Sequence, residues 1–295
     1  MRPESPTRCG TIVLAGLPNA GKSTLLNAAV GTPLAITSDK PQSTRQRVVG
    51  IRTEGPVQLL FVDPPGLLEP HYLLQHTMLE EALEVLGGGD AILHLHRADA
   101  APAPSFATLV PEERLRGRSV ATVYTAIDTV PLASRPPASP SVFPISAVTG
   151  EGMEALLAWC ESRVPIGPFR YAADDLSTQP SRFFVAEFVR EAAFELLQQE
   201  LPYALTAHVD EFREGSDPVY IRVTIYVERA SQKGMVIGAG GRTIKALGAR
   251  ARQRIEALLG TAVYLDLWVK VLPHWRKSPQ VLQDLGFRLP VRRNA

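Results

Sequence analysis

The sequence predicts an α/β fold in two parts: a mainly parallel sheet covered by helices, and then a smaller domain of mixed helices and strands. Three observations predict it. Short apolar runs alternate with amphipathic stretches in the first part of the chain, and a glycine-rich loop joins the first run to a helix-prone one. A break at Pro165-Ile166-Gly167-Pro168 then separates this pattern from one in which a long helix precedes two strands.

Length and composition favour a globular protein of two domains. The chain has 295 residues, of which 45% are hydrophobic and 21% are charged. No apolar run approaches the roughly 20 residues that span a bilayer, and Met1–Thr7 does not resemble a secretion signal. Cys9 and Cys160 are far apart and form no motif, so we interpret them as inert thiols in a reducing cytosol.

The charge is unevenly distributed along the chain. A net charge of +1 combines a net −2 over residues 1–170 with a net +3 over residues 171–295. Between Arg229 and Ile255 there are seven basic residues and no acidic one. A polyanion responds to such a local patch more than to the total charge, so we expect a polyanionic partner for the second part.

The first domain is predicted from its strands and helices. Apolar runs predict strands at Thr11–Ala15, Val57–Val62, Ala91–Leu95, Val120–Tyr124 and Val142–Ile145. Helices are expected over Leu25–Val30, Tyr72–Leu86 and Gly152–Arg163. In a parallel sheet of this kind, ligands bind beyond the carboxyl ends of the strands, and the motifs below fall at such ends.

A phosphate-binding loop follows the first strand. The motif is Gly16-Leu17-Pro18-Asn19-Ala20-Gly21-Lys22-Ser23-Thr24, with two glycines that let successive N–H groups point at phosphate oxygens. The helix that follows adds the positive end of its dipole. We expect Lys22 to reach the β- and γ-phosphates and Ser23 to ligate Mg²⁺. The alternative is a glycine-rich turn before an ordinary helix.

Two further motifs contribute to the phosphate end of this predicted site. Thr44, in the polar loop Gly31–Arg47, is a candidate ligand of Mg²⁺, or else part of a solvated loop. Asp63 can hold Mg²⁺ through water, and the N–H of Gly66 can reach a γ-phosphate; the alternative is a Pro-Gly turn.

The base is expected to bind at two later strand ends. Asp128 can accept two hydrogen bonds from guanine, which adenine cannot donate, although a turn aspartate is the alternative. Ser146-Ala147-Val148 can wrap the base with N–H groups, or cap the next helix.

Together these motifs resemble the Era family of translation-associated GTPases, and Thr37–Arg45 is especially similar to that family. The resemblance implies a Ras-like fold, binding of GTP, GDP and Mg²⁺, and slow GTP hydrolysis. It assigns catalytic roles to Lys22, Thr44, Gly66 and Asn19. Asn19 resembles the residue through which some relatives bind a monovalent cation, often K⁺. The residues after Gly66 are Leu67 and Leu68, neither of which can orient water as a glutamine could. Hydrolysis is therefore expected to depend on positioning and electrostatics.

Two motifs depart from this family. In the third motif, Pro64 stands where the family usually has threonine; proline rigidifies the turn and is expected to alter how Leu67–His71 responds to nucleotide. The fourth motif departs further. Where the family has Asn-Lys-x-Asp, the chain has Thr125-Ala126-Ile127-Asp128. The lysine stem normally packs over the base, and the asparagine ties this loop to the phosphate-binding loop. We therefore expect both contacts to be lost and nucleotide affinity to fall by about five- to a hundredfold.

The second domain is expected over residues 181–295, after a nucleotide-binding domain over 1–168 and a linker over 169–180. Helices are predicted at Arg182–Glu200 and Thr243–Leu259. Strands are predicted at Leu205–Phe212, Tyr220–Val227 and Ala262–Val271.

A Gly-x-x-Gly loop, Gly238-Ala239-Gly240-Gly241, lies in the acid-free basic window between two helical segments. The order of elements is similar to a bacterial-type (type II) KH domain, which reads about four unpaired nucleotides. Tyr226–Gly238 and Leu267–Val271 also resemble the Era family, so the resemblance covers essentially the whole chain. The RNA-binding candidates are Arg229, Lys233, Gly238, Ala239, Gly240, Gly241, Arg242 and Lys245. Ile237, Ile244 and Leu247 line the base groove or belong to the core. The alternative for the basic residues is a solvated helix face.

The leading hypothesis is a GTP-switched RNA-binding protein. The resemblance implies binding to the 3′ end of 16S rRNA and a role in assembly of the 30S subunit. It implies a cytoplasmic location; peripheral association with the inner membrane is a trait of the family for which these residues provide no argument. A constitutive RNA-binding module with a degenerate nucleotide site is the alternative, and a phosphate-loop kinase or ATPase is a weaker third.

Overall fold

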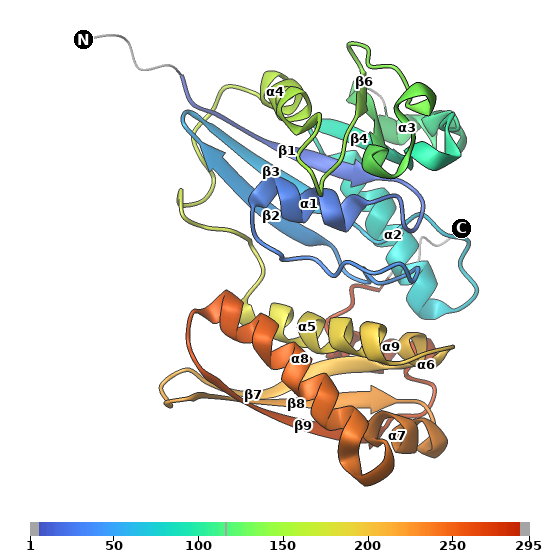
Figure 1. Ribbon diagram of the computed structural model, residues 1–295, viewed down its shortest axis with the longest axis vertical. Coiled ribbons are helices and arrows are strands. Elements are labelled where there is room, and N and C mark those ends of the chain that lie inside the picture. The colour runs from blue at the N-terminus through green and yellow to red at the C-terminus, as the bar shows by residue number, and fades with distance from the viewer. Residues whose placement is uncertain (1–5, 116, 290–295) are drawn as a thin grey trace. The chain divides into compact units, whose positions relative to one another are not determined.

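The computed structural model describes residues 6–115 and 117–289, which form two compact units. Within these ranges, the first unit comprises residues 6–35, 44–71, 75–115 and 117–178, and the second comprises residues 36–43, 72–74 and 179–289. Figure 1 labels the helices and strands along the chain. Within the described ranges, no helix is both long enough and apolar enough to cross a membrane.

The first unit is built on a six-stranded sheet with the order β2-β3-β1-β4-β5-β6. Its strands are β1 (Arg8–Ala15), β2 (Val48–Glu54), β3 (Val57–Asp63), β4 (Ala91–Arg97), β5 (Ser119–Thr125) and β6 (Val142–Pro144). All neighbouring strands run parallel except β2, which is antiparallel to β3. The predicted, mainly parallel sheet is confirmed.

Strand β2 was not expected from the sequence. It pairs with β3 across a short turn that contains Gly55 at φ 52°, a value that glycine adopts readily. Gly50 on β2 lies against Leu26 and Val30, so the strand supports the helix of the phosphate-binding loop. A strand of this kind is recognised only when its partner is known, because its sequence lacks a long apolar run.

Helices cover this sheet. The α-helices are α1 (Lys22–Val30), α2 (Leu73–Gly88), α3 (Glu112–Leu115) and α4 (Met153–Arg163). Short 3₁₀ turns lie at Ala98–Ala100, Phe106–Thr108, Ile127–Thr129 and Leu132–Ser134. Val13 and Ile92 pack with Ala82 and Leu86 of α2 in one apolar cluster. Successive strand residues face opposite sides, so Ile12 and Leu14, both fully buried, fill the other face.

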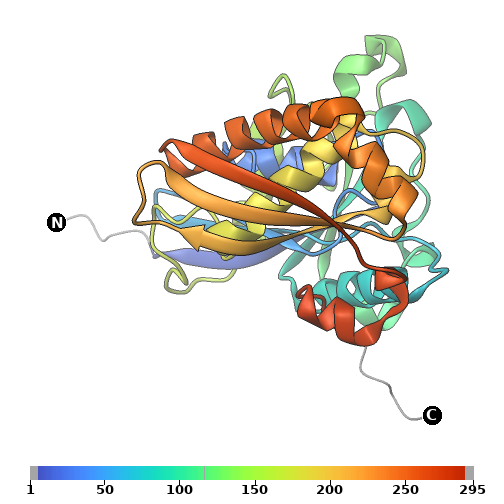
Figure 2. The same cartoon turned by 90° about the horizontal axis from the view of Figure 1, so that it is seen from below.

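The second unit has a three-stranded sheet with helices on one side. Its strands, in the order β7-β8-β9, are β7 (Thr206–Arg213), β8 (Val219–Val227) and β9 (Val263–Val271). Its helices are α5 (Ser181–Leu196), α6 (Leu201–Ala204), α7 (Ala230–Ile237), α8 (Arg242–Leu259) and α9 (Pro279–Asp284), with 3₁₀ turns at Ala239–Gly241 and Trp275–Lys277. Figure 2 shows α5 and α8 together on one face of this sheet. Strand β9 is at the edge and runs parallel to β8.

Helix α5 ends earlier than the sequence predicts. It stops at Leu196, and Gln199 adopts a positive φ of 55°, so the predicted end at Glu200 is wrong. Lys40 accounts for part of this ending, because its Nζ donates hydrogen bonds to the carbonyl oxygens of Phe194 and, at 2.6 Å, of Leu197. A lysine that binds the last carbonyls of a helix satisfies groups that have no partner within the helix.

Residues 36–43 are therefore part of the second unit, although the main segment of that unit begins only at residue 179. Besides the contacts of Lys40, Arg190 of α5 donates a hydrogen bond of 2.8 Å to the carbonyl oxygen of Ser43. The amide of Thr37 donates a hydrogen bond of 3.5 Å to the carboxylate of Glu191, also on α5. This grouping was not predicted, because long-range packing leaves no local signal in a polar loop.

Candidate nucleotide site and nucleic-acid groove

The loop between β1 and α1 has the backbone geometry of a phosphate-binding loop. Gly16 has φ 154° and Gly21 has φ 87°. A Cβ at Gly16 would lie 2.6 Å from the carbonyl oxygen of Leu95, and a Cβ at Gly21 would lie 3.2 Å from the Thr125 side chain. Both positions thus need glycine for space as well as for conformation. Asn19, also at a positive φ of 64°, completes the sharp turn before the helix begins.

Helix α1 begins at Lys22, so its first N–H groups face the loop. Ser23 and Thr24 lie in its first turn, where the positive end of the helix dipole favours an anion. The Lys22 Nζ donates to the carbonyl oxygens of Gly16 (3.3 Å) and Leu17 (3.0 Å). An ammonium group has three protons, so one more is available for a phosphate oxygen.

Three oxygen-bearing side chains meet beside this loop. The Ser23 hydroxyl donates to Asp63 Oδ2 at 2.6 Å and lies 3.1 Å from Thr44 Oγ1, which is 3.4 Å from the same carboxylate oxygen. Asp63 is fully buried, and its Oδ1 has no hydrogen-bond partner within the described part of the chain. An orphaned buried carboxylate oxygen beside two hydroxyls fits a hydrated Mg²⁺, which takes oxygen ligands and keeps several waters.

The charges at this site are held out of water. Burial raises the pKa of Asp63, an effect opposed by the Lys22 ammonium and by the hydrogen bonds from Ser23 and Thr44. Burial also lowers the pKa of Lys22, opposed by the charge of Asp63. In the protein without a ligand, burial thus makes the charged form of each side chain less favourable. A bound cation next to Asp63 and a phosphate next to Lys22 would remove both penalties.

Gly66 follows β3 and approaches the phosphate-binding loop closely. A Cβ there would lie 3.1 Å from the backbone nitrogen of Pro18. The next amide, that of Leu67, donates to the carbonyl oxygen of Gly16 at 3.3 Å. The turn after β3 and the loop after β1 therefore lie in direct contact.

The departure at Thr125 does not break the link between the two nucleotide loops. Thr125 is buried, and its Oγ1 donates a hydrogen bond of 3.0 Å to the carbonyl oxygen of Ala20. The expectation that this tie is lost is therefore wrong. A threonine is shorter than an asparagine, but here its side chain also packs against Gly21, so the two loops are close enough for a hydroxyl to bridge them.

The base-binding end is more open than the phosphate end. Asp128 is exposed in the 3₁₀ turn Ile127–Thr129, and Ala126, where the family has lysine, has a positive φ of 57°. Ser146 is fully buried, and its Oγ accepts a hydrogen bond from the amide of Thr149 at 3.1 Å, which curls the segment. Ala147 and Val148 follow it, and Val148 is 79% exposed.

His94 and His96, which face the same side of β4, have structural contacts. The His94 ring stacks on Phe106 with centroids 4.7 Å apart, and His96 Nε2 lies 2.8 Å from the carbonyl oxygen of Ala100. Burial, with the nearby His96, lowers the pKa of His94 to about 4. Among residues 6–115 and 117–289, no group of three His, Cys, Asp or Glu side chains could hold a metal ion.

The second site is a groove of the second unit, next to the Gly-x-x-Gly loop. Gly238, Gly240 and Gly241 all have positive φ, and a Cβ at Gly238 would lie 2.1 Å from the Thr243 hydroxyl. The loop leads directly into α8, whose N-terminus favours phosphate. Ala239 carries no charge, but exposed cations lie on, or at the start of, the helices before and after the loop. They are Arg229, Lys233, Arg242 and Lys245.

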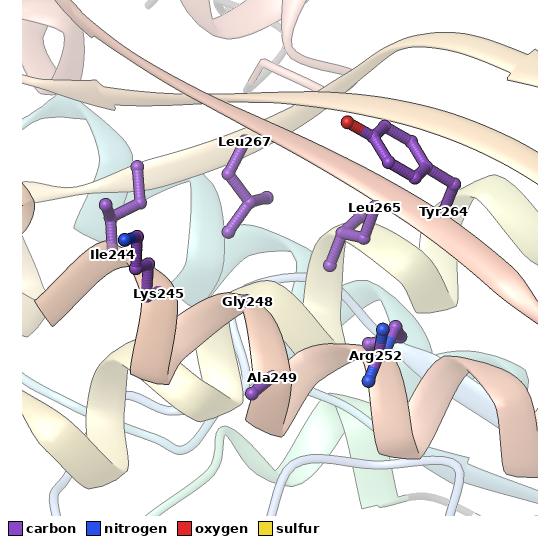
Figure 3. A pocket seen from close by; sticks show the side chains of 8 residues that line it. All are labelled: Ile244, Lys245, Gly248, Ala249, Arg252, Tyr264, Leu265 and Leu267. Carbon is purple, nitrogen blue, oxygen red and sulfur yellow. The ribbon is translucent and has the colours of Figure 1, made fainter. Parts of the chain in front are cut away.

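A pocket of about 370 Å³ lies between α8 and β9 (Figure 3). Its lining consists of Ile244, Lys245, Gly248, Ala249, Arg252, Tyr264, Leu265 and Leu267. At Gly248 a Cβ would lie 3.3 Å from Leu267, so the glycine keeps the helix close to the strand. Of the residues expected either to line the base groove or to belong to the core, Ile244 lines the pocket and Leu247 is fully buried in the core. Arg252 and Tyr264 were not among the residues predicted from the sequence. The four-residue spacing of Ile244, Gly248 and Arg252, which places them on one helix face, could have indicated Arg252.

Not all cations of the basic window are available to a ligand. Arg250 lies 2.7 Å from Glu195 and Arg254 lies 2.9 Å from Glu191, so these two hold α8 against α5. In contrast, Arg252 is 3.9 Å from Glu256, beyond hydrogen-bonding distance, and faces the pocket. The ion pairs with α5 thus divide the basic window into a structural side and a groove side.

These sites define a phosphate-loop nucleotide-binding protein with a KH-type RNA-binding unit. Family models agree: residues 11–123 match the 50S ribosome-binding GTPase model, and residues 200–276 match the KH domain model. The chain is 39% identical to GTPase Era of Nitratidesulfovibrio vulgaris over 95% of this chain and 96% of that one. It is 37% identical to GTPase Era of Leuconostoc citreum, over 96% and 98%. The chain belongs to the Era family of GTPases.

Two solved structures match nearly the whole chain. One is a variant of Aquifex aeolicus Era bound to GDP and AlF₄⁻, with a TM-score of 0.89. The other is Era in complex with MgGDPNP and nucleotides 1506–1542 of 16S ribosomal RNA, with a TM-score of 0.87. Each is 32% identical and covers 96% of this chain and 100% of its own. The Ras-like domain followed by a type II KH domain, predicted from the sequence, is confirmed.

Proposed function

We propose that this protein is a GTP-switched RNA-binding protein that binds the 3′ region of 16S rRNA and assists assembly of the 30S subunit in the cytoplasm. Residues 1–168 form its nucleotide-binding domain, residues 169–180 the linker and residues 181–295 its RNA-binding domain. The observation that carries the nucleotide half is the cluster of Ser23, Thr44 and the half-satisfied carboxylate of Asp63 beside the glycine loop. Relatives whose structures hold GDP and AlF₄⁻, or MgGDPNP with 16S rRNA, support both halves.

In this proposal, different residues of the first unit bind the phosphates, the Mg²⁺ and the base. The loop from Gly16 through Pro18, Asn19, Ala20 and Gly21 to Thr24 cradles the phosphates, and Lys22 and Gly66 reach the γ-phosphate. Mg²⁺ neutralises charge that develops on the phosphates, held by Ser23, Thr44 and, through water, Asp63. Thr125 positions the base loop, Asp128 selects guanine, and Ser146, Ala147 and Val148 close around the ring.

Hydrolysis is expected to be slow for a structural reason. Leu67 is buried and Leu68 is apolar, so neither side chain can orient an attacking water. The contributions left to this chain are charge from Lys22 and the helix N-terminus, with Asn19 as the candidate link to a monovalent cation such as K⁺.

A titration of the intact protein tests the nucleotide half. GTP, GDP and ATP are titrated by calorimetry at millimolar Mg²⁺, with Lys22→Ala as the control for the phosphate site. We expect saturable binding of both guanine nucleotides, weak or no ATP binding, and loss of binding in the variant. Absence of saturable GTP binding would favour a constitutive RNA-binding module, and tighter binding of ATP would favour a kinase or ATPase.

The RNA half is tested at the Gly-x-x-Gly loop with a matched control. Gly241 and Gly260 flank α8, both have positive φ (76° and 68°), and neither has an atom within 4 Å of an added Cβ. Gly241→Asp is expected to abolish binding of an RNA spanning 16S nucleotides 1506–1542, because it places a negative charge where phosphates approach. Gly260→Asp imposes the same strain and charge at the other end of α8. Equal RNA binding by the two variants would contradict the KH-loop assignment.

Nucleotide state is also expected to influence the second unit through the chain itself. Thr44 contacts Ser23 and Asp63 in the first unit, while the eight residues before it, Ile36–Ser43, belong to the second. A change at Thr44 that accompanies γ-phosphate loss would therefore act on a segment held by Lys40 and Arg190. Comparison of RNA affinity with GDP and with a non-hydrolysable GTP analogue tests this; equal affinities would exclude it.

A further inference from the structure

The groove of the second unit extends beyond the part that the Gly-x-x-Gly loop serves. Lys245 lies near the loop, whereas Arg252 is seven residues further along α8, a distance of roughly 10 Å in a helix. Tyr264, near the start of β9, lies at the same far end of the lining. The described residues at this end therefore differ in kind from the aliphatic wall near the loop: they are an arginine and an aromatic ring.

Tyr264 is the outermost member of a stacked column. Its ring is nearly parallel to that of Tyr220, with an interplanar angle of 13° and centroids 5.8 Å apart. The guanidinium carbon of Arg213 lies 5.0 Å from the Tyr220 centroid, on which Arg222 also packs at 5.6 Å. The Tyr220 hydroxyl donates to Asp266 at 2.9 Å. The column is thus fixed before any ligand arrives, which lowers the ordering cost of binding.

The end of the column is open to solvent. Tyr264 is 59% exposed, and β9 is the edge strand of its sheet, so no further strand of residues 6–115 or 117–289 covers it. In Figure 3, Leu265 and Leu267 project from β9 toward α8, and the Tyr264 ring lies on the other side of the strand, at the rim of the pocket. An exposed aromatic ring beside a nucleic-acid groove is the arrangement on which unpaired bases stack.

From these observations we infer that Tyr264 and Arg252 form an additional nucleotide subsite at the far end of the groove. A base stacks on the exposed Tyr264 ring, and the Arg252 guanidinium contacts the neighbouring phosphate. The occupant is the RNA strand that leaves the groove, because the pocket lining is continuous from Lys245 to Tyr264. The inference rests on the proposed RNA binding by this groove and extends its reach beyond four nucleotides.

Stacking of one base on an aromatic ring is expected to strengthen binding by about five- to a hundredfold. The test measures this increment in the full-length protein. Fluorescein-labelled single-stranded RNAs of four, six and eight nucleotides, nested within 16S nucleotides 1506–1542, are titrated by anisotropy. Variants are Tyr264→Ala, Tyr264→Phe, which keeps the ring, and Arg252→Ala, with Tyr171→Ala, an exposed tyrosine of the first unit, as control.

We expect wild-type affinity to rise at least fivefold from the shortest to the longest RNA. Tyr264→Ala is expected to remove that gain while leaving four-nucleotide binding within about twofold, and Tyr264→Phe to keep it. Arg252→Ala should lower affinity for the longer RNAs and reduce their salt dependence. Equal behaviour of Tyr264→Ala and wild type at all lengths, or equal losses at all lengths, would overturn the subsite. Failure of Gly241→Asp to weaken any RNA would instead overturn the RNA-binding groove itself.

Discussion

The nucleotide site of the first unit and the groove of the second both address phosphates, but they hold their charges in opposite ways. In the first unit, Lys22 and Asp63 are buried, with 6% and 0% exposure, and their pKa values shift against the charged forms. In the second unit, Lys245 and Arg252 are exposed on a helix face. An enclosed site selects its ligand by geometry and by charges that need a buried partner, whereas an open groove selects its ligand weakly and its charges are screened by salt.

Removal of the buried charge is expected to have the largest effect on this contrast between the two sites. Asp63→Asn keeps an oxygen that can accept from Ser23 but no longer attracts Mg²⁺, so affinity for MgGTP should fall at least a hundredfold. Burial raises the pKa of Asp63. In the protein without nucleotide, the folded state therefore loses stability as the pH rises through this raised pKa and Asp63 ionises. The nucleotide-free variant should therefore melt at a higher temperature than wild type at pH 8, with a gap that narrows on acidification.

Asp99→Asn is the control for this experiment, because Asp99 is an exposed carboxylate that pairs with Arg97 at 2.8 Å. It should change neither nucleotide binding nor the melting curve appreciably. A similar melting gain in both variants would show that burial of Asp63 is not its cause.

A smaller effect is expected at the link between the two nucleotide loops. Thr125→Val keeps the shape of the side chain and removes the hydroxyl that binds the Ala20 carbonyl. Loss of one hydrogen bond of this kind should weaken GTP and GDP alike by about five- to tenfold. Thr129→Val removes a hydroxyl that bonds only to the Ala126 carbonyl in the exposed turn, and should leave binding unchanged. Equal losses would mean that loop stability, and not the tie, controls affinity.

Salt dependence sharpens the contrast from the side of the groove. Arg242→Ala and Lys245→Ala should each weaken RNA binding severalfold and flatten the plot of log affinity against log salt by about 0.7. The Arg250 guanidinium is paired with Glu195 of α5, so Arg250→Ala should change this slope less. Measurements from about 50 to about 500 mM salt, one decade, check both slopes; a common slope change would contradict the division of the basic window.

The smallest effect concerns His94, which lies outside both sites. Its pKa is lowered by burial to about 4, so the unfolded chain, with an ordinary histidine, binds more protons in the window between about 6.5 and 4. Its contribution to stability should be complete above that window and be lost as pH falls through it. His94→Phe, which keeps the stacking on Phe106, should flatten that part of the stability profile. An unchanged profile would show that other groups produce the acid slope.

Sequence reasoning placed Ser23 and Asp63 at the ends of predicted strands, and the structure brings both together with Thr44 beside the glycine loop. This was predictable because the motif combines glycine geometry with a fixed position between strand and helix. Sequence reasoning was wrong about Thr125, since the distance between two loops far apart in the sequence is set by packing at Gly21. It missed β2 and the far end of the groove, because an edge partner and a pocket wall depend on long-range pairing. The placement of Ile36–Ser43 with the second unit had no local signal for the same reason.

The most direct test of the account is base selection by Asp128. In the wild type, its carboxylate is expected to accept hydrogen bonds from guanine, and Asp128→Asn should exchange that preference for xanthine. Competition between GTP and xanthosine triphosphate for the full-length protein at millimolar Mg²⁺ measures it. The account predicts that GTP wins in wild type and xanthosine triphosphate wins in the variant. An unchanged preference for GTP in Asp128→Asn would contradict it.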